Sequence, residues 1–218
     1  MSKLEFKINK NDIKRHNECL ICENKKLIKI SRNFYKNKFV FFETSVCNKC
    51  LYIFRTQRPN LNWFLRNFKK RFNYQKKNKV IYINKNIEKY REERYKKIFN
   101  FLLNKINFKS VIDIGSGPGT GLKYLNSKNK EVYALEPDKS RAVIAKKNKI
   151  NVIIKELEKI KNFKKFDLIT CIQTLEHFQN PYQALKIMKN FMNENSYIYI
   201  EVPNFYNNVI SFHDSFYL

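Results

Sequence analysis

The chain has 218 residues, of which 43% are hydrophobic and 15% aromatic, enough apolar material for one ordinary domain with a smaller companion. This composition excludes a wholly disordered chain. The chain has 44 Lys and Arg against 19 Asp and Glu, a formal net charge of +25 that points to nucleic acid, phosphorylated ligands or an anionic membrane surface. A second interpretation stays open, because 35 of the cations are Lys, and abundant Lys, Asn, Ile and Phe together are typical of an AT-rich genome.

No stretch reaches the roughly 18 uncharged apolar residues that a membrane-spanning helix needs. Residues 1–7 contain no apolar run that would serve as a signal peptide. We therefore expect a cytoplasmic protein without a membrane span. In that reducing compartment, five cysteines predict metal ligands rather than disulfides.

The first recognisable motif is a pair of Cys-x-x-Cys sequences. Cys19 and Cys22 form one pair and Cys47 and Cys50 the other, with 24 residues between them. Two such pairs supply four thiolates to one tetrahedral Zn²⁺, and four protein ligands leave no open position for a reacting water. We expect a structural zinc site, for which the nearby His16 is not needed as a ligand.

Residues 59–108 are basic and rich in aromatic side chains. Between Tyr52 and Lys85 the spacing of apolar residues predicts no clear secondary structure, although the aromatic residues there are compatible with one face of a helix. From Glu88 to Ile106, apolar residues recur at helical spacing with charged residues between them, which predicts an amphipathic helix.

Only four glycines occur in the chain, and all of them fall within residues 115–121. After them, strand and helix patterns alternate. The predicted strands are 111–114, 132–136, 151–154, 166–171 and 196–202, and the predicted helices are 140–148 and 181–193, with Asn180 as N-cap of the second. This alternation predicts an α/β fold with a Rossmann-like, doubly wound and mostly parallel sheet.

The glycine segment connects the first of these strands to a helix and has an unusual acid before it. Asp113 precedes Gly115 by two residues, and a carboxylate there would repel a pyrophosphate but suits a ligand with an ammonium group. Glu136 ends the next strand, where α/β nucleotide sites place a carboxylate for the ribose hydroxyls. An ammonium group and a ribose without a pyrophosphate describe S-adenosylmethionine.

At this point residues 110–204 resemble the class I S-adenosylmethionine-dependent methyltransferases, through the glycine loop, Glu136, residues 171–178 and residues 200–204. The resemblance implies a set of cofactor-binding residues: Asp113, Gly115, Ser116, Gly117, Gly119, Glu136, Pro137, Glu156, Leu157 and Gln173. It also implies candidate catalytic residues. His177 is the candidate base, Glu176 would orient it or contact the acceptor, and His213 belongs to a faint acceptor motif in which Ser215 replaces the last His.

The end of the chain departs from that family, whose sheet has seven strands. Only 15 residues follow Pro203, too few for a helix and the last two strands. We therefore expect either a C-terminally incomplete domain or self-association through the unfinished sheet edge. The predicted division is a zinc-binding module at 1–58, a helical linker region at 59–108 and a cofactor-binding domain at 109–218.

A four-Cys module ahead of such a domain resembles bacterial sugar methyltransferases of polysaccharide and nucleotide-sugar pathways. Residues 51–59 add to this likeness, as an apolar strand followed by a basic, Pro-containing turn. The resemblance implies methyl transfer to a sugar or nucleotide-linked sugar in surface polysaccharide biosynthesis. Residues 171–174 lack the Asn/Asp-Pro-Pro-aromatic motif of base amino-group methylases. Two alternatives stay open: a ribosomal RNA methyltransferase, and a truncated, non-catalytic module that binds zinc and cofactor.

Overall fold

The computed structural model describes residues 8–34, 41–60, 62, 63, 66, 67, 70 and 85–203 of the chain. The chain divides into two compact units, Met1–Tyr74 and Gln75–Leu218. The three-part division at residues 58 and 108 stays a prediction.

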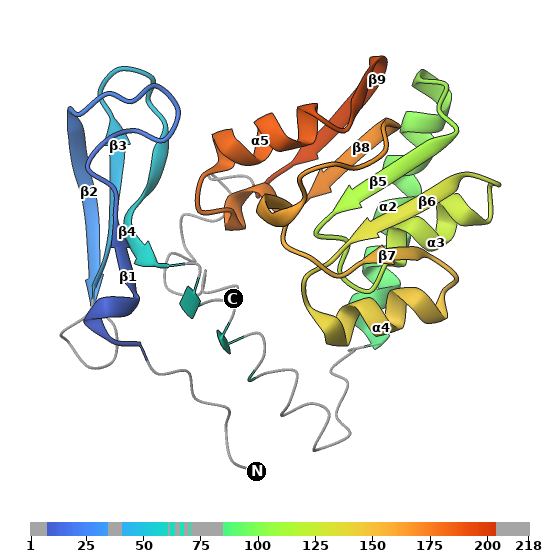
Figure 1. The fold of residues 1–218 in the computed structure, drawn as a ribbon, viewed down its shortest axis with the longest axis horizontal. Helices are drawn as coiled ribbons and strands as arrows, with labels where there is room; N and C mark the ends of the chain where they lie inside the picture. The colour runs from blue at the N-terminus through green and yellow to red at the C-terminus, as the bar shows by residue number, and fades with distance from the viewer. Residues whose placement is uncertain are drawn as a thin grey trace. The chain divides into compact units, whose positions relative to one another are not determined.

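The first unit contains an antiparallel sheet of strand order β1-β4-β3-β2. Its elements are a short 3₁₀ helix η1 (Lys10–Asp12) and the strands β1 (Ile13–Arg15), β2 (Leu27–Phe34), β3 (Phe41–Cys47) and β4 (Ile53–Pro59) (Figure 1). The basic turn expected at the end of residues 51–59 was wrong, because β4 continues as a strand to Pro59 and pairs with β1 there. Residues 57–59, although typical of a turn, are extended because β4 lies between β1 and β3 in the sheet.

The second unit contains a five-stranded parallel sheet, which confirms the predicted fold class. Its strands are β5 (Ser110–Ile114), β6 (Glu131–Leu135), β7 (Asn151–Ile153), β8 (Phe166–Ile172) and β9 (Met192–Glu201), in the order β7-β6-β5-β8-β9. The chain thus runs outward from β5 in both directions, as a doubly wound sheet does. Ligands of such sheets bind outside the carboxyl ends of the strands, at the point where the order reverses.

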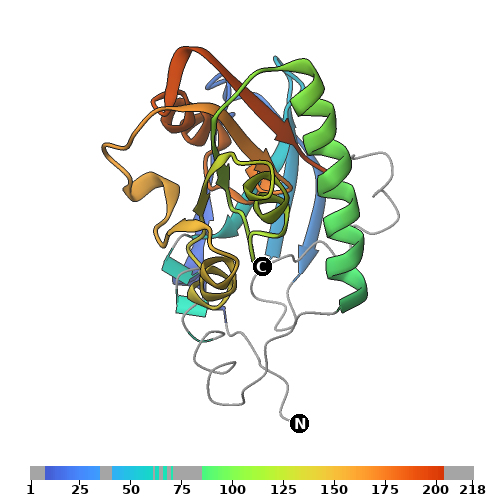
Figure 2. The same ribbon diagram turned by 90° about the vertical axis from the view of Figure 1, so that its right-hand side faces the viewer.

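Helices cover both faces of this sheet. The helices α2 (Lys85–Lys105), α3 (Thr120–Asn126) and α4 (Lys139–Lys147) contribute to one apolar cluster, and α5 (Pro181–Lys189) contributes to a second. Figure 2 shows α2 as the long green helix of this unit. Because α2 leads into β5 and runs back along the sheet, its N-terminal half lies toward the carboxyl ends of the strands, where Glu88 Oε2 accepts a hydrogen bond from Thr120 Oγ1 (2.7 Å).

The predicted boundaries differ from the structure most at α5 and β9. The Asn180 cap is confirmed, because its side chain accepts a hydrogen bond from the Gln183 N–H. The helix nevertheless ends at Lys189 instead of continuing to residue 193, and β9 begins at Met192 instead of residue 196. Burial of Phe191, whose carbonyl accepts from the Phe166 N–H (2.8 Å), turns the chain early.

β9 is an edge of the described sheet and exposes Tyr197, Ile198 and Ile200. Self-association along this edge stays a prediction. Within the described residues, no helix combines the length and the apolar composition that crossing a bilayer requires.

Gly121, the last of the four glycines, is required by the packing of α3 on α2. A Cβ at this position would lie 2.4 Å from a ring carbon of Tyr95 and 2.8 Å from one of Phe99. These two rings stack on each other with centroids 5.9 Å apart, and Phe99 is buried. The missing side chain therefore lets the two helices approach.

Gly121→Ala should destabilise the chain by about 1–2 kcal/mol, because the overlap with two stacked rings exceeds the gain in helix propensity. Urea unfolding measures the change in free energy. Lys123→Ala, at an exposed position of the same helix, is the matched control and should change it by less than about 0.5 kcal/mol. A Gly121→Ala protein more stable than the wild type would contradict the packing argument.

Candidate functional site

The glycine loop lies between β5 and α3, at the carboxyl edge of the parallel sheet. Gly115, Gly117 and Gly119 all have positive φ angles, of 73°, 59° and 74°. The loop is anchored to the neighbouring strand, since the Gly115 N–H donates to the Leu135 carbonyl (2.8 Å). Such a backbone is strained for residues with a side chain, so the glycines fix the loop's shape.

Glu136, immediately after β6, joins this loop to the next segment. Its Oε2 accepts a hydrogen bond from the Gly117 N–H and its Oε1 from the Asp138 N–H, both at 2.8 Å. The residue is only 4% exposed, and burial raises its pKa. Each carboxylate oxygen retains a second lone pair, so Glu136 can hold the loop and still accept a hydrogen bond from a ligand hydroxyl.

Asp113 lies inside β5 and is 2% exposed. Its Oδ1 accepts a hydrogen bond from Thr170 Oγ1 of the adjacent strand β8 (2.7 Å). Burial, opposed by the hydrogen bond from Thr170 and assisted by the charge of Glu136, raises the pKa of Asp113 to about 7. Two neighbouring carboxyl groups in a desolvated setting favour a cationic ligand, which would stabilise their ionised forms.

Gly117 is the one glycine of the loop whose missing side chain faces open space. Apart from its two chain neighbours, none of the described residues lies within 4 Å of a Cβ placed there. At Gly115 and Gly119, by contrast, a Cβ would come within 2.6 Å of Thr174 and Ile150 side chains. The loop therefore packs tightly at both ends and leaves its middle open beside Glu136, as a cradle for a ligand requires. These features fit a ligand that carries a cation and ribose hydroxyls.

The segment after β8 borders the loop from the other side. Gln173 has a positive φ of 51°, and its neighbour Thr174 lies against Gly115. The Gln173 side chain donates to Glu201 Oε1 (3.0 Å), and its backbone N–H donates to the Glu201 carbonyl (2.8 Å). Gln173 thus links the glycine loop to the end of β9.

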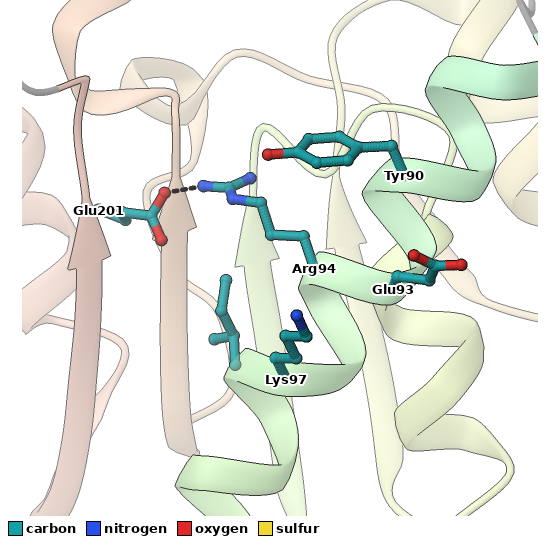
Figure 3. Close-up of a pocket in the computed structure, with 6 residues that line it drawn as sticks. Tyr90, Glu93, Arg94, Lys97 and Glu201 are labelled. Carbon is teal, nitrogen blue, oxygen red and sulfur yellow. Dashed lines mark ion pairs between the residues drawn. The ribbon is translucent and has the colours of Figure 1, made fainter. Parts of the chain in front are cut away.

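Glu201 also forms an ion pair with Arg94 of α2. Figure 3 shows Arg94 and Tyr90 extending from α2 toward Glu201, beside a cavity of about 290 Å³. Glu93, Lys97 and Ile98 complete its lining. Arg94 and Glu201 were not predicted as site residues, since nothing in a single sequence pairs two charges more than 100 positions apart.

The predicted catalytic residues lie just beyond Gln173. Glu176 and His177 belong to the 3₁₀ helix η3 (Leu175–His177), with His177 Nε2 3.8 Å from Glu176 Oε1. The His177 side chain is 51% exposed, and burial raises the pKa of Glu176. His213, the third candidate, lies outside the described residues.

The other predicted cofactor residues lie around the same edge. Ser116 is buried in the loop, Pro137 follows Glu136, and Glu156 stands at the start of the 3₁₀ helix η2 (Leu157–Lys159), where it pairs with Lys159 at 3.0 Å. The Leu157 side chain packs in the apolar cluster with α5. Because all these segments follow strands of one parallel sheet, the fold brings them to the same edge.

The four cysteines of the first unit converge as predicted. Their Sγ atoms all lie within 4.8 Å of one another, with Cys19–Cys50 at 3.5 Å and Cys22–Cys47 at 3.6 Å. Tetrahedral Zn–S bonds place sulfur atoms about 3.8 Å apart, so the donor set fits a closed four-thiolate metal site. Burial opposes ionisation of Cys47, but N–H donors from Cys50, Asn24 and Lys49 outweigh it and lower its pKa to about 6.

Comparison with known families gives one match over more than half of the chain. A family profile described as a methyltransferase domain matches residues 87–214. The match includes all but the first two residues of α2, the glycine loop, Glu136 and the segment after β8.

Two curated proteins are similar over a shorter stretch. The ubiquinone biosynthesis O-methyltransferase of Glaesserella parasuis serovar 5 (strain SH0165) is 26% identical over 108 residues, covering 44% of this chain and 46% of the relative. The protein of the same name from Rickettsia typhi (strain ATCC VR-144 / Wilmington) is 28% identical over 107 residues, covering 46% and 44%. The matched part is thus slightly under half the length of each relative.

Among solved structures, the plantazolicin methyltransferase BpumL in complex with a monoazolic desmethylPZN analog and SAH has a TM-score of 0.50 and 20% sequence identity. The similarity covers 69% of this chain and 58% of BpumL. At this identity the likeness concerns the fold.

The raised pKa of Asp113 predicts a pH-dependent stability. The folded chain keeps this carboxyl protonated up to about pH 7, whereas the unfolded chain ionises it near 3.8. Its favourable contribution is therefore present below about pH 4 and is lost as the pH rises to about 7. Asp113→Asn keeps the acceptor for Thr170 but removes this titration. As the pH rises from about 4 to about 7, the wild type should therefore lose about 2–4 kcal/mol of unfolding free energy relative to the Asp113→Asn variant. Urea unfolding of both proteins at matched pH values measures it; a pH-independent difference would show that Asp113 ionises normally.

Proposed function

Because the chain belongs to the methyltransferase-domain family, we propose that it transfers a methyl group from S-adenosylmethionine to a sugar or nucleotide-linked sugar. The observation that carries the cofactor assignment is the open position above Gly117, beside the buried carboxyl group of Glu136 that accepts from its N–H. When bound, S-adenosylmethionine supplies a methyl group on a positively charged sulfur. The residues of this chain would hold and align it.

Each side chain of the site has a distinct part in this proposal. Glu136 accepts hydrogen bonds from the ribose hydroxyls, while the hydrogen bonds that it accepts from the Gly117 and Asp138 N–H groups keep it in place. Asp113 supplies negative charge for the ammonium group. Since methyl transfer is an in-line displacement, the alignment of acceptor and methyl group accounts for much of the acceleration.

His177 is the proposed base for a hydroxyl acceptor. Its exposed imidazole lies on η3, directly after the Gln173–Thr174 segment that borders the glycine loop. An imidazole removes a proton effectively near neutral pH. Glu176 Oε1 lies 3.8 Å from His177 Nε2, so it would orient the ring by moving into hydrogen-bonding distance. His177→Ala should retain cofactor affinity and lose methyl transfer; unchanged turnover would assign proton removal to another group.

The acceptor proposal rests on the four-Cys module ahead of the domain and on the excess of cations, which attracts phosphate groups. Methylation of RNA is the second candidate, favoured by the net charge of +25. The two differ in salt dependence, because an RNA complex releases many counterions and weakens steeply as salt increases.

Gly117→Ala tests the cofactor assignment. The new methyl group would enter the open space, so the affinity for S-adenosylmethionine should fall about tenfold or more, equivalent to about 1.4 kcal/mol. Asn129→Ala is the matched control, since Asn129 has a φ of 58° against 59° at Gly117 but lies in another loop. Both variants bear the same left-handed backbone strain, and only Gly117→Ala should lose affinity in calorimetry. Equal affinities would overturn the assignment of this cradle.

We also propose that the four-Cys cluster holds one structural Zn²⁺, whose binding stabilises the first unit. Cys22→Ser should lose the metal, whereas Cys171→Ser, which changes the cysteine buried in β8, should keep it. Native mass spectrometry measures the zinc per chain. Retention of one zinc by the Cys22→Ser chain would contradict a four-thiolate site.

A further inference from the structure

Positive charge is concentrated in the first unit. Residues 1–74 contain 18 Lys and Arg against five Asp and Glu. Two of these acids are already paired with cations: Asp12 with Arg66, and Glu43 with Lys29 and Arg32. These two acids are therefore engaged by cations that lie outside β1 and β4.

The pairing of β1 with β4 places two cations directly opposite each other. Lys14 is the cross-strand partner of Arg58. Directly opposite residues of an antiparallel pair project on the same face, and like charges there are destabilising. His16 follows Lys14 by two residues, and its N–H continues the ladder to the Thr56 carbonyl (2.7 Å). Lys14, His16 and Arg58 thus share one face of the sheet.

Arg55 joins this group from the same strand as Arg58. The pairing of β3 with β4 shifts register between Glu43 and Thr44, so that β4 does not alternate regularly around Thr56. Burial and, to a smaller extent, the nearby charge of Arg55 together lower the pKa of Arg58 to about 10. Burial, Lys14 and Arg58 likewise lower the pKa of His16. Burial is the largest cause of both shifts, and the smaller charge contributions come from neighbouring cations of this group.

The ring of His16 adds an independent observation. Its Nε2 is buried and has no hydrogen-bond partner among the residues that the structure describes. A buried polar atom without a partner is costly, by about as much as a lost hydrogen bond. This one lies beside Lys14 and Arg58, where an acceptor oxygen would satisfy it.

We propose that Lys14, His16, Arg55 and Arg58 form a binding site for the diphosphate group of a small ligand. Guanidinium groups match phosphate oxygens with paired hydrogen bonds, and Lys14 adds a point charge. A site confined to β4 and the residues of and just after β1 suits a compact group, whereas a nucleic-acid backbone needs a longer track of cations. That this ligand is the acceptor, a nucleotide-linked sugar, rests on the proposed function; the site itself does not.

The test is calorimetric titration of the full, zinc-loaded chain with inorganic pyrophosphate at constant ionic strength, without S-adenosylmethionine. Lys14→Gln should weaken binding about tenfold, the effect of losing one charged hydrogen bond. Lys25→Gln is the matched control, because it removes the same charge from another exposed position of the same unit. Arg58→Gln should weaken binding at least as much as Lys14→Gln.

The free energy of unfolding in urea separates a binding role of Lys14 from a purely structural one. Removing Lys14 relieves repulsion with Arg58, so Lys14→Gln should be at least as stable as wild type while it binds more weakly. Equal affinities of the Lys14→Gln, Lys25→Gln and wild-type chains would overturn the proposal, as would no binding of pyrophosphate. Tighter, steeply salt-dependent binding of single-stranded RNA, lost in Lys14→Gln, would overturn the assignment to a small ligand. Failure of methyl transfer would leave this test unaffected.

Discussion

One buried carboxylate, Glu136, joins three segments on which the candidate site depends. It accepts hydrogen bonds from the N–H of Gly117 in the glycine loop and from the N–H of Asp138, which in turn caps α4 through the Ser140 N–H. A buried charge of this kind is stable only when its oxygens are hydrogen-bonded. The loop therefore takes the one shape that satisfies Glu136, and that shape places Gly117 beside it. The hydrogen bonds of Glu136 therefore determine both the stability of the glycine loop and the geometry of the candidate ligand site.

The four glycines lie close together in the sequence but have different roles in the structure. Gly121 permits contact between α2 and α3, and Gly115 and Gly119 allow the loop to pack against Thr174 and Ile150. Only Gly117 leaves open space. Three of the four positions thus build the cradle, and one faces what the cradle would hold. Only the structure distinguishes these roles, because the four glycines look alike in the sequence.

Much of the second unit could be predicted because its signals are local. Apolar strands, the Asn180 cap and the glycine loop each occupy a few consecutive residues, and the parallel sheet brings the ends of its strands to one edge. The antiparallel sheet of the first unit was missed, since strands such as β4 carry Arg, Gln and Pro and are held extended by partners distant in sequence. The pairing of Arg94 with Glu201 and of Lys14 with Arg58 was missed for the same reason. Spacing did predict the four-Cys cluster, because Cys-x-x-Cys fixes its geometry locally.

We propose that Glu136 and the loop around Gly117 hold a nucleoside ligand with a charged amino-acid tail. A crystal structure of the full chain with S-adenosylhomocysteine tests it most directly. We expect the ribose hydroxyls within hydrogen-bonding distance of Glu136, the amino-acid part over Gly117 toward Asp113, and the Glu136 bonds to the Gly117 and Asp138 N–H groups intact. Density for the ligand elsewhere, or a loop rearranged so that Glu136 no longer accepts from Gly117, would contradict the account.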